Sequence, residues 1–299
     1  MSKNTFSRVA TFVALSYTLA FVIDIIALRS GLAASLRTGT TPIVWGFARM
    51  WSVALSAVVC LVIYREGVAA NLKRFLTVSR GVVKYYLIAP LIVYGALALY
   101  IAIALPLGFF NFNAYVETIV DTLRSAMPSS VSEEQITSIA TVAAYVQIFS
   151  GYIAAITINA FYALGEEIGW RGYLYSTLGS RPSLRNTIII GVLWGFWHTS
   201  AIVLLGFQYT VTRYLGVVLF TLYTIALSYP HLLVTTTTGS VIPAASLHGA
   251  VNAIWYITVL ASNLPEEQRE LFLGLGLLGI VTWTILSTIL YKATKTPSR

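Results

Sequence analysis

Eight apolar runs, each long enough to cross a bilayer, dominate this 299-residue chain. A spanning helix needs roughly 20 apolar residues, whereas a spanning β-strand needs about 10 residues of alternating polarity. The runs do not alternate, and charged residues make up 10% of the chain against roughly 25% in soluble domains. We therefore predict an all-α, polytopic membrane protein with about eight transmembrane helices. The predicted spans are about 9–28, 43–64, 85–109, 139–163, 187–206, 214–234, 241–261 and 271–291.

No internal repeat or long polar linker divides the chain, so residues 1–299 are predicted to form a single membrane domain. The longest polar stretch, about 110–138, has apolar residues at helical spacing. This spacing predicts an amphipathic helix on the membrane surface, with a solvated loop as the alternative. Asp24 and Arg49 in the first two spans are expected to pair, and a substrate contact is the alternative role for Asp24.

The net charge of +8 follows the predicted topology. Twelve basic residues fall on one side of the eight-span arrangement and five on the other. Such an excess marks the cytoplasmic side, which predicts that both termini are cytoplasmic. The partner of this basic surface is then anionic membrane lipid, and nucleic acid is not expected. The twelve are Lys3, Arg8, Arg65, Lys73, Arg74, Arg80, Lys84, Arg181, Arg185, Lys292, Lys295 and Arg299; the five are Arg29, Arg37, Arg124, Arg213 and Arg269.

The first span has two interpretations. A basic start, an apolar run and the small residues at 31–35 are also typical of a cleaved signal peptide. We favour a retained span because the run is long, contains Asp24 and keeps the charge count consistent. The single Cys60 excludes an intrachain disulfide.

Two of the eleven acidic residues, Glu166 and Glu167, stand side by side in an apolar stretch. Ionised carboxylates are costly in hydrocarbon and usually face a bundle interior or a wet cavity. On a helix, Glu167 and Arg171 share a face and can pair, whereas Glu166 is rotated by about 100° and lacks a nearby cation in the sequence. Such a difference is typical of an acting base beside a structural carboxylate. Gly165 and Gly169, at GxxxG spacing, predict the close approach of another helix.

Two of the three histidines lie in other predicted spans, each four residues from a second distinctive side chain. Trp194 shares a helix face with His198, so the indole can shield the imidazole from water. His248 shares a face with Asn252, and an imidazole and an amide together can supply the donors of an oxyanion hole. The third histidine, His231, is expected to be interfacial.

The depths of these residues favour a common site. At 1.5 Å per residue from the basic side, His198 lies about 16 Å deep, His248 about 11 Å and Glu166 about 22 Å. We therefore predict a polar intramembrane cavity between the fourth, fifth and seventh spans, with the motif-bearing core at about 155–255.

The three motifs resemble those of the CPBP family, which contains the type II CAAX prenyl endopeptidases. The family pattern is EExxxR, then (F/W)xxxH, then HxxxN/D. Here it reads Glu166-Glu167-Ile-Gly-Trp-Arg171, Trp194-Gly-Phe-Trp-His198 and His248-Gly-Ala-Val-Asn252. Each motif alone is weakly specific, but three in order within a polytopic chain are a strong indication. The resemblance implies an all-α intramembrane protease of about eight helices.

The resemblance also implies residue roles. Glu166 and His198 would activate the attacking water, and His248 and Asn252 would stabilise the oxyanion. The supporting residues would be Glu167, Arg171 and Trp194.

We favour a glutamate-type mechanism without a metal, and the chain lacks HExxH, the helical zinc signature. The zinc-dependent alternative would use Glu166, His198 and His248 as ligands.

The resulting hypothesis is an intramembrane endopeptidase acting near the C-terminus of prenylated (CAAX) or other membrane-associated substrates. A transporter or proton relay is one alternative, since intramembrane ionisable groups also mark conduction paths. Neither paired repeats nor broken helices, which are both common in transporters, are expected from the sequence. A catalytically silent immunity or scaffold protein is another alternative. For Glu166, Glu167 and Arg171, the structural alternative is a buried ion pair that only fixes helix packing.

Overall fold

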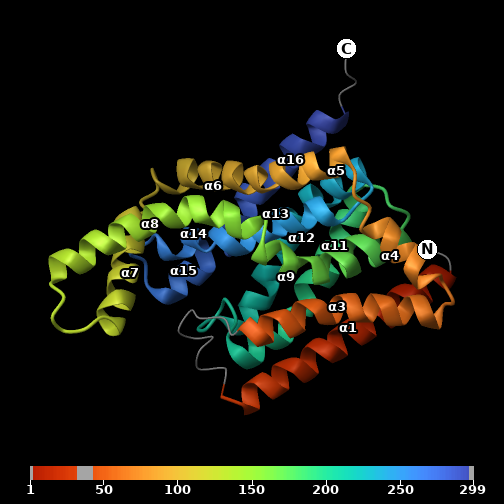
Figure 1. The fold of residues 1–299 in the computed structure, drawn as a ribbon, viewed down its shortest axis with the longest axis horizontal. Coiled ribbons are helices and arrows are strands. Elements are labelled where there is room, and N and C mark those ends of the chain that lie inside the picture. The colour runs from red at the N-terminus through yellow and green to blue at the C-terminus, as the bar shows by residue number, and fades with distance from the viewer. Residues whose placement is uncertain (1–2, 32–42, 296–299) are drawn as a thin grey trace.

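The computed structural model describes residues 3–31 and 43–295 (Figure 1). Every regular element in these ranges is a helix, and seven helices are long and apolar enough to cross a membrane. The prediction of an all-α, polytopic membrane protein is confirmed. Arg37, Arg299 and most of the segment 31–35 lie outside the described residues. The seven helices are Lys3–Arg29, Ile43–Ile63, Arg80–Ala104, Glu133–Ala155, Leu184–Leu205, Arg213–Thr238 and Glu266–Thr294.

The helices α1 and α3 lie along one edge of the molecule and α5 and α6 along the opposite edge, with the motif-bearing helices between them (Figure 1). Elements labelled η are π-helices. In chain order the elements are α1 (Lys3–Arg29), α3 (Ile43–Ile63), α4 (Val68–Phe75), α5 (Arg80–Ile88), α6 (Pro90–Ala104), α7 (Phe112–Ala126), α8 (Glu133–Ala155), α9 (Ile158–Glu167), η1 (Ile168–Leu174), α10 (Tyr175–Thr177), α11 (Leu184–Trp197), η2 (Ala201–Leu205), α12 (Arg213–Thr238), α13 (Ile242–Ile254), α14 (Ile257–Leu260), α15 (Glu266–Phe272) and α16 (Leu277–Lys295).

Local sequence sets several helix boundaries. Ser79, Ser132 and Ser183 each accept a backbone N–H of the first turn of α5, α8 and α11, which satisfies a donor that would otherwise lack a partner. Ser132 and Gln135 form a reciprocal capping box. Gly239 ends α12 in the left-handed region at φ 69°, where a glycine is favoured.

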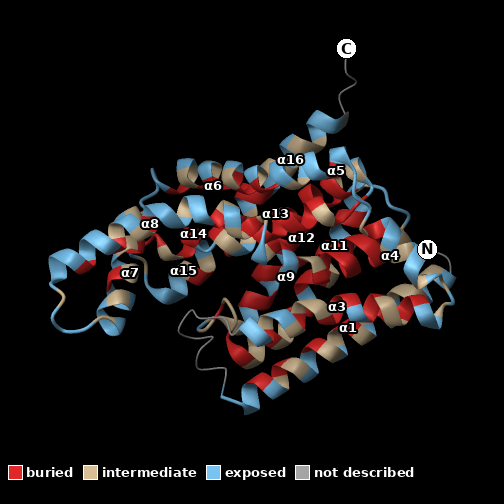
Figure 2. Cartoon of the chain, viewed as in Figure 1, coloured by how far each residue is buried: buried red, intermediate tan, exposed pale blue. Residues whose placement is uncertain are grey.

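Burial increases toward the centre of the bundle (Figure 2). In α12, 78% of the most apolar 18 residues are buried, against 22% in α1 and in α8. The outer helices thus present apolar faces outward, as expected where lipid is the solvent. The centre formed by α9, α11, α12 and α13 is the part of the fold that positions the motifs.

The predicted fourth span, 139–163, is not one helix. The helix α8 ends at Ala155 and α9 begins at Ile158, because Thr157 leaves helical geometry at φ −128°, ψ −103°. The elements α9, η1 and α10 then continue one after another from Ile158 to Thr177 and carry the first motif. Because 152–160 holds no proline or glycine, the sequence does not reveal this break.

The predicted seventh span, 241–261, is also divided. Its main part, α13, has 13 residues and is therefore about 20 Å long, short of the roughly 30 Å of a hydrocarbon core. The helix α13 packs against α8, α9 and α12. A buried helix can be as apolar as a spanning one, which explains why seven long helices are found where about eight spans were predicted.

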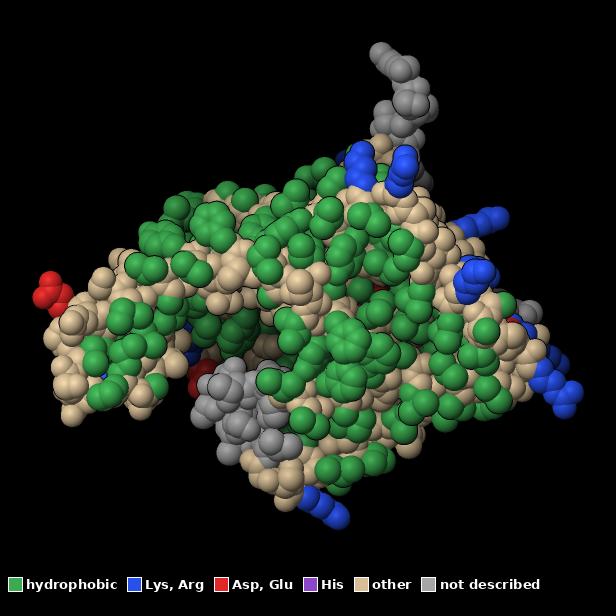
Figure 3. Space-filling view, in the orientation of Figure 1, with side chains coloured by type: hydrophobic (Ala, Val, Ile, Leu, Met, Phe, Trp, Pro, Cys, Tyr) green, Lys and Arg blue, Asp and Glu red, His purple; other side chains and the backbone are tan. Residues whose placement is uncertain are grey.

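The polar stretch 110–138 contains the helix α7, in agreement with the helical alternative. Its Val120 packs with Ile136 and Ala140 of α8. At the other end of the molecule, Lys and Arg side chains gather around α4 and α5, whereas acidic side chains mark the end near α7 and the start of α8 (Figure 3). Basic residues that the sequence analysis assigns to one side of the membrane thus also lie at one end of the structure.

Asp24 and Arg49 form the expected ion pair between α1 and α3, with Nε of Arg49 3.1 Å from Oδ1 of Asp24. Both side chains are buried. Trp45 and Ser200 also donate to the Asp24 carboxylate, at 2.9 and 2.6 Å. Arg49 in turn donates to the backbone oxygen of Trp197 at 2.8 Å. The pair thus ties the first two long helices to the end of α11.

Candidate active site

A cavity of about 390 Å³ lies between the motif-bearing helices. Its walls include all four residues predicted to be catalytic, Glu166, His198, His248 and Asn252, and also Trp194. The rest of the lining is largely apolar and aromatic. Such a cavity, with a few converging polar groups, has the size and character of a small ligand or substrate site.

The first motif is held close to α3 by its glycines. A Cβ on Gly165 would lie 2.8 Å from the backbone oxygen of Met50, and one on Gly169 would lie 2.4 Å from Cγ1 of Val53. Both positions therefore exclude a larger side chain, and the predicted close helix approach is confirmed. The motif then passes into η1, a π-helical segment of the kind often found at functional sites.

The third motif is brought to the first by Gly249. A Cβ there would lie 2.6 Å from the backbone oxygen of Ala155 and 2.8 Å from the backbone nitrogen of Ala160. The helix α13 can therefore lie directly against the break between α8 and α9. This close contact places His248 beside the two glutamates.

Glu166 is buried and lines the cavity. Its Oε2 accepts a 2.6 Å hydrogen bond from Nε1 of Trp194. No ion pair joins Glu166 to any residue that the structure describes. The carboxylate is thus held by a neutral donor at the wall of the cavity.

Glu167 has a different set of partners. Its Oε1 accepts hydrogen bonds from Nη1 of Arg171 at 3.0 Å and from Nδ1 of His248 at 2.8 Å. The Arg171 guanidinium lies over the Trp194 ring, 4.1 Å from its centroid. Neither Glu167 nor Arg171 is part of the cavity lining. Thus one carboxylate lies at the cavity wall and the other is neutralised behind it.

Hydrogen bonds fix the tautomers of the two histidines that line the cavity. Nδ1 of His198 lies 2.9 Å from the backbone oxygen of Trp194, and Nδ1 of His248 bonds to the Glu167 carboxylate. Carbonyl and carboxylate oxygens only accept, so in each ring Nδ1 carries the proton. Nε2 of each neutral ring is then the acceptor.

Three side-chain amides line the cavity: Asn159, Gln208 and Asn252. The Asn252 side chain is exposed, whereas Nδ2 of Asn159 donates to the backbone oxygen of Gly249 at 3.3 Å. Asn159 was not predicted as a site residue. A polar amide in an apolar run seven residues before Glu166 was the available signal.

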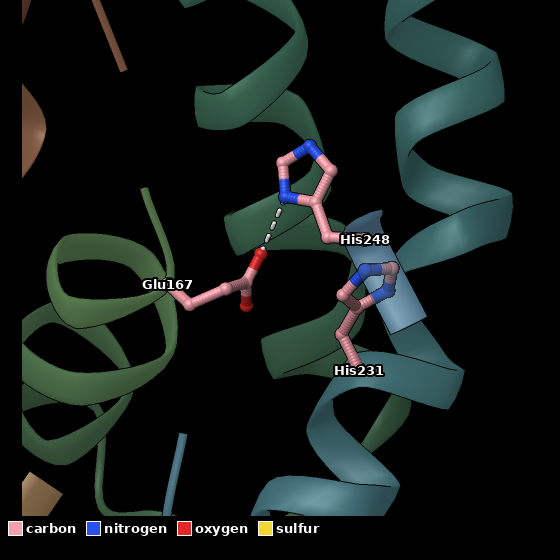
Figure 4. A group of neighbouring side chains, drawn as sticks. All are labelled: Glu167, His231 and His248. Carbon is pink, nitrogen blue, oxygen red and sulfur yellow. Dashed lines mark hydrogen bonds and ion pairs between the residues drawn. The ribbon is translucent and has the colours of Figure 1, made fainter. Parts of the chain in front are cut away.

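The expectation that His231 is interfacial is wrong. The helix α12 continues through Pro230 to Thr238, so His231 lies inside the helix and is 0% exposed. Its ring centroid is 5.6 Å from that of Trp194. The centroid of the His248 ring is 5.8 Å away (Figure 4). The sequence analysis therefore did not predict that a third histidine, His231, lies beside the site.

A metal fits this arrangement poorly. Within the described ranges, the group of three potential ligands with atoms within 4.8 Å of one another is Glu167, His231 and His248, rather than the predicted alternative of Glu166, His198 and His248. Oε1 of Glu167 already accepts from both Arg171 and His248. Oε2 of Glu167 has no hydrogen-bond partner among the described residues, but a divalent cation there would lie next to the buried Arg171 guanidinium.

Comparison with known proteins agrees with the position of the motifs. Residues 148–254 match the family described as type II CAAX prenyl endopeptidase Rce1-like. Among curated proteins, the chain is similar to "CAAX prenyl protease 2" of Methanococcus maripaludis, with 38% identity over 48 residues. These residues are 16% of this chain and 18% of that relative, so most of both lengths lies outside the match. No solved structure matches the chain significantly.

Proposed function

We propose that this chain, whose residues 148–254 match the Rce1-like family of type II CAAX prenyl endopeptidases, belongs to that family and is an intramembrane endopeptidase that hydrolyses peptide bonds with an activated water. The observation that carries the proposal is the shared cavity of Glu166, His198, His248 and Asn252. These residues offer a base and hydrogen-bond donors around a space large enough for a substrate segment.

Glu166 and His198 act on the water. Glu166 is held by the Trp194 indole and has no cation bound to it among the described residues, so its carboxylate is available as a proton acceptor. Nε2 of His198 is unprotonated because Nδ1 donates to the Trp194 backbone. Trp194 thus orients both groups, one through its side chain and one through its carbonyl. A positioned base of this kind typically contributes about 10²–10⁴ to the rate.

His248 and Asn252 act on the substrate carbonyl. The neutral form of His248 has a bare Nε2, so His248 must be an imidazolium in order to donate to the developing oxyanion. Glu167 is bonded to Nδ1 and stabilises that charge, as an acid behind a catalytic histidine does. The Asn252 amide supplies the second donor, and the imidazolium can later protonate the leaving amine.

The reaction needs no metal in this proposal. The charge on Glu167 is already balanced by Arg171, and the carboxylate at the cavity wall is held by an indole. A bound zinc would supply a Lewis acid and an activated water, with Glu166, His198 and His248 as its ligands. We favour the direct glutamate mechanism because the three potential ligands that lie within 4.8 Å of one another are not these residues but Glu167, His231 and His248. Of these, the Glu167 carboxylate is already bonded to Arg171.

The proposed substrate is a membrane-associated peptide, with a prenylated CAAX C-terminus as the first candidate. The largely apolar cavity lining suits a lipid-bearing or apolar chain. The name of the archaeal relative, a CAAX prenyl protease, points to the same substrate class. The partners are then membrane lipid and a peptide, with no role for nucleic acid.

In the proposed orientation, both termini and the basic end of the molecule are cytoplasmic. The gathering of Lys and Arg around α4 and α5 supports this orientation (Figure 3). The cavity would then open to the cytoplasm or to the lipid, where membrane-anchored substrates arrive.

The proposal is tested by incubating purified protein with a prenylated CAAX peptide and identifying the products by mass spectrometry. Cleavage is expected with the wild type and not with Glu166→Ala. Glu117→Ala, which removes an exposed carboxylate of α7, serves as the matched control and should cleave normally. A non-prenylated peptide of the same sequence tests whether the lipid is required. Equal cleavage by wild type and Glu166→Ala would contradict the proposal.

A further inference from the structure

His231 is the one histidine that the proposed mechanism does not use. It belongs to none of the three motifs and is fully buried. Its Nδ1 lies 3.0 Å from the backbone oxygen of Leu227, whereas its Nε2 has no hydrogen-bond partner in the part of the chain that the structure describes. A buried polar atom of this kind calls for a physical explanation, because such groups are costly when unpaired.

The tautomer of His231 follows from its one hydrogen bond. The Leu227 carbonyl can only accept, so Nδ1 carries the proton. The neutral ring therefore presents Nε2 as a lone pair. This acceptor belongs to a ring packed against Trp194 and next to His248, which Figure 4 shows beside it.

The charged groups around the ring complement that lone pair. Glu167 from α9 and His248 from α13 each have a side-chain atom within 4.8 Å of one on His231, and Nη1 of Arg171 from η1 lies 3.0 Å from Oε1 of Glu167. Nε and Nη2 of Arg171 are buried and have no acceptor among the described residues, while Nη1 is bound to Glu167. A neutral acceptor beside a buried guanidinium is favourable, whereas an imidazolium there would add a second cation.

We propose that His231 is a positioning residue: its unprotonated Nε2 adds a neutral acceptor, without a hydrogen bond in the described residues, to the buried cluster of Glu167, His248 and Arg171, and this favours the Nδ1 proton of His248. The link is the shared oxygen Oε1 of Glu167, which accepts from both Arg171 and His248. With a neutral acceptor near the Arg171 guanidinium, Glu167 can keep its bond to His248. Without that acceptor, Arg171 depends on Glu167 alone and competes with His248 for the carboxylate.

Two substitutions separate this role from simple packing. His231→Leu fills the space without an acceptor, whereas His231→Gln keeps an acceptor near the position of Nε2. In the proteolytic assay, which rests on the proposed function, His231→Leu should lower kcat by about 10–100-fold with little change in KM, a loss of the size seen when groups that orient a functional histidine are removed. His231→Gln should restore most of the activity. Equal losses for both variants would assign His231 to packing and overturn the proposal.

A second measurement does not depend on activity. The chain has only three histidines, so protein labelled with ¹⁵N-histidine gives three imidazole signals, which single substitutions assign. We expect His248 to be protonated at Nδ1 in the wild type and in His231→Gln, and to lose this preference in His231→Leu. Thr221→Val, on the same helix, also buried and with its hydroxyl bonded to the backbone oxygen of Val217, is the matched control and should leave the His248 signal unchanged.

The outcomes of the two measurements are distinct. An unchanged His248 tautomer in His231→Leu overturns the proposal even if the protein is an active protease. A changed tautomer in a protein that cleaves no peptide supports the network and contradicts only the proposed function. If His231→Leu does not fold, His231→Gln alone is decisive, since loss of the Nδ1 proton preference in that variant would overturn the proposal.

Discussion

His248 donates its Nδ1 proton to Oε1 of Glu167 across 2.8 Å, and this bond joins the third motif to the first. Glu167 lies next to Glu166 in the sequence, yet only Glu166 lines the cavity with His248. The adjacent carboxylates therefore have different partners, and the following predictions derive from that difference.

Glu166→Gln should abolish hydrolysis while leaving the protein nearly as stable as the wild type. A glutamine can still accept the Trp194 indole N–H, and no charge is left unpaired by the change. Thermal unfolding in detergent and cleavage of a prenylated peptide measure the two effects separately.

Glu167→Gln, the matched isosteric substitution, should lose stability as well as activity. It leaves Arg171 buried without its counter-ion, and breaking a fully buried pair typically costs about 3–5 kcal/mol. Equal melting losses for the two glutamine variants would show that the carboxylates are not divided in this way.

Asn252→Ala should retain a trace of activity where Glu166→Ala retains almost none. Removing one oxyanion donor typically lowers kcat by about 10²–10³, because the other donor stays in place. Single-turnover kinetics measure the step directly. An Asn252→Ala variant with wild-type kcat would remove Asn252 from the oxyanion site.

Asp24→Asn should destabilise the protein, because Arg49 would remain buried without a counter-charge. The loss expected for such a pair is again about 3–5 kcal/mol. In the double variant Asp24→Asn/Arg49→Met no charge is left buried, and much of the stability should return. A double variant less stable than Asp24→Asn would show that Arg49 stabilises the fold by other contacts.

The topology predicts which residues share a side of the membrane. In a Cys60→Ser background, single cysteines at Lys73 and Arg181 should react with an impermeant thiol reagent from the cytoplasmic side. A cysteine at Asp121 on α7 should react only from the other side. Labelling of the Lys73 and Arg181 positions from opposite sides would exclude the predicted arrangement.

Much of this organisation could be predicted from the sequence, because hydrophobic length and rare ionisable groups carry the signal in membrane proteins. The Asp24–Arg49 pair and the close approach at Gly165 and Gly169 were predicted and are found. The close approach depends on the spacing of two glycines in one helix, and the ion pair depends on the small number of charged residues in the spans. Spacing and charge are both properties of the sequence.

The features that escaped prediction depend on tertiary contacts. The helix break at Thr157 lacks a proline or glycine signal, and α13 is as apolar as a spanning helix although it is short and buried. His231 lies beside the site because α12 continues through Pro230 and packs against α11 and α13. Periodicity along one segment contains no information on such a neighbour.

The most direct test of metal-free water activation by Glu166 is turnover after exhaustive chelation, with the metal content of the same sample measured by mass spectrometry. Wild-type protein without detectable zinc should cleave a prenylated peptide at its original rate, and Glu166→Ala should stay inactive with or without added zinc. Activity that disappears with the metal and returns with zinc would contradict the mechanism and would make Glu166, His198 and His248 candidates for metal ligands.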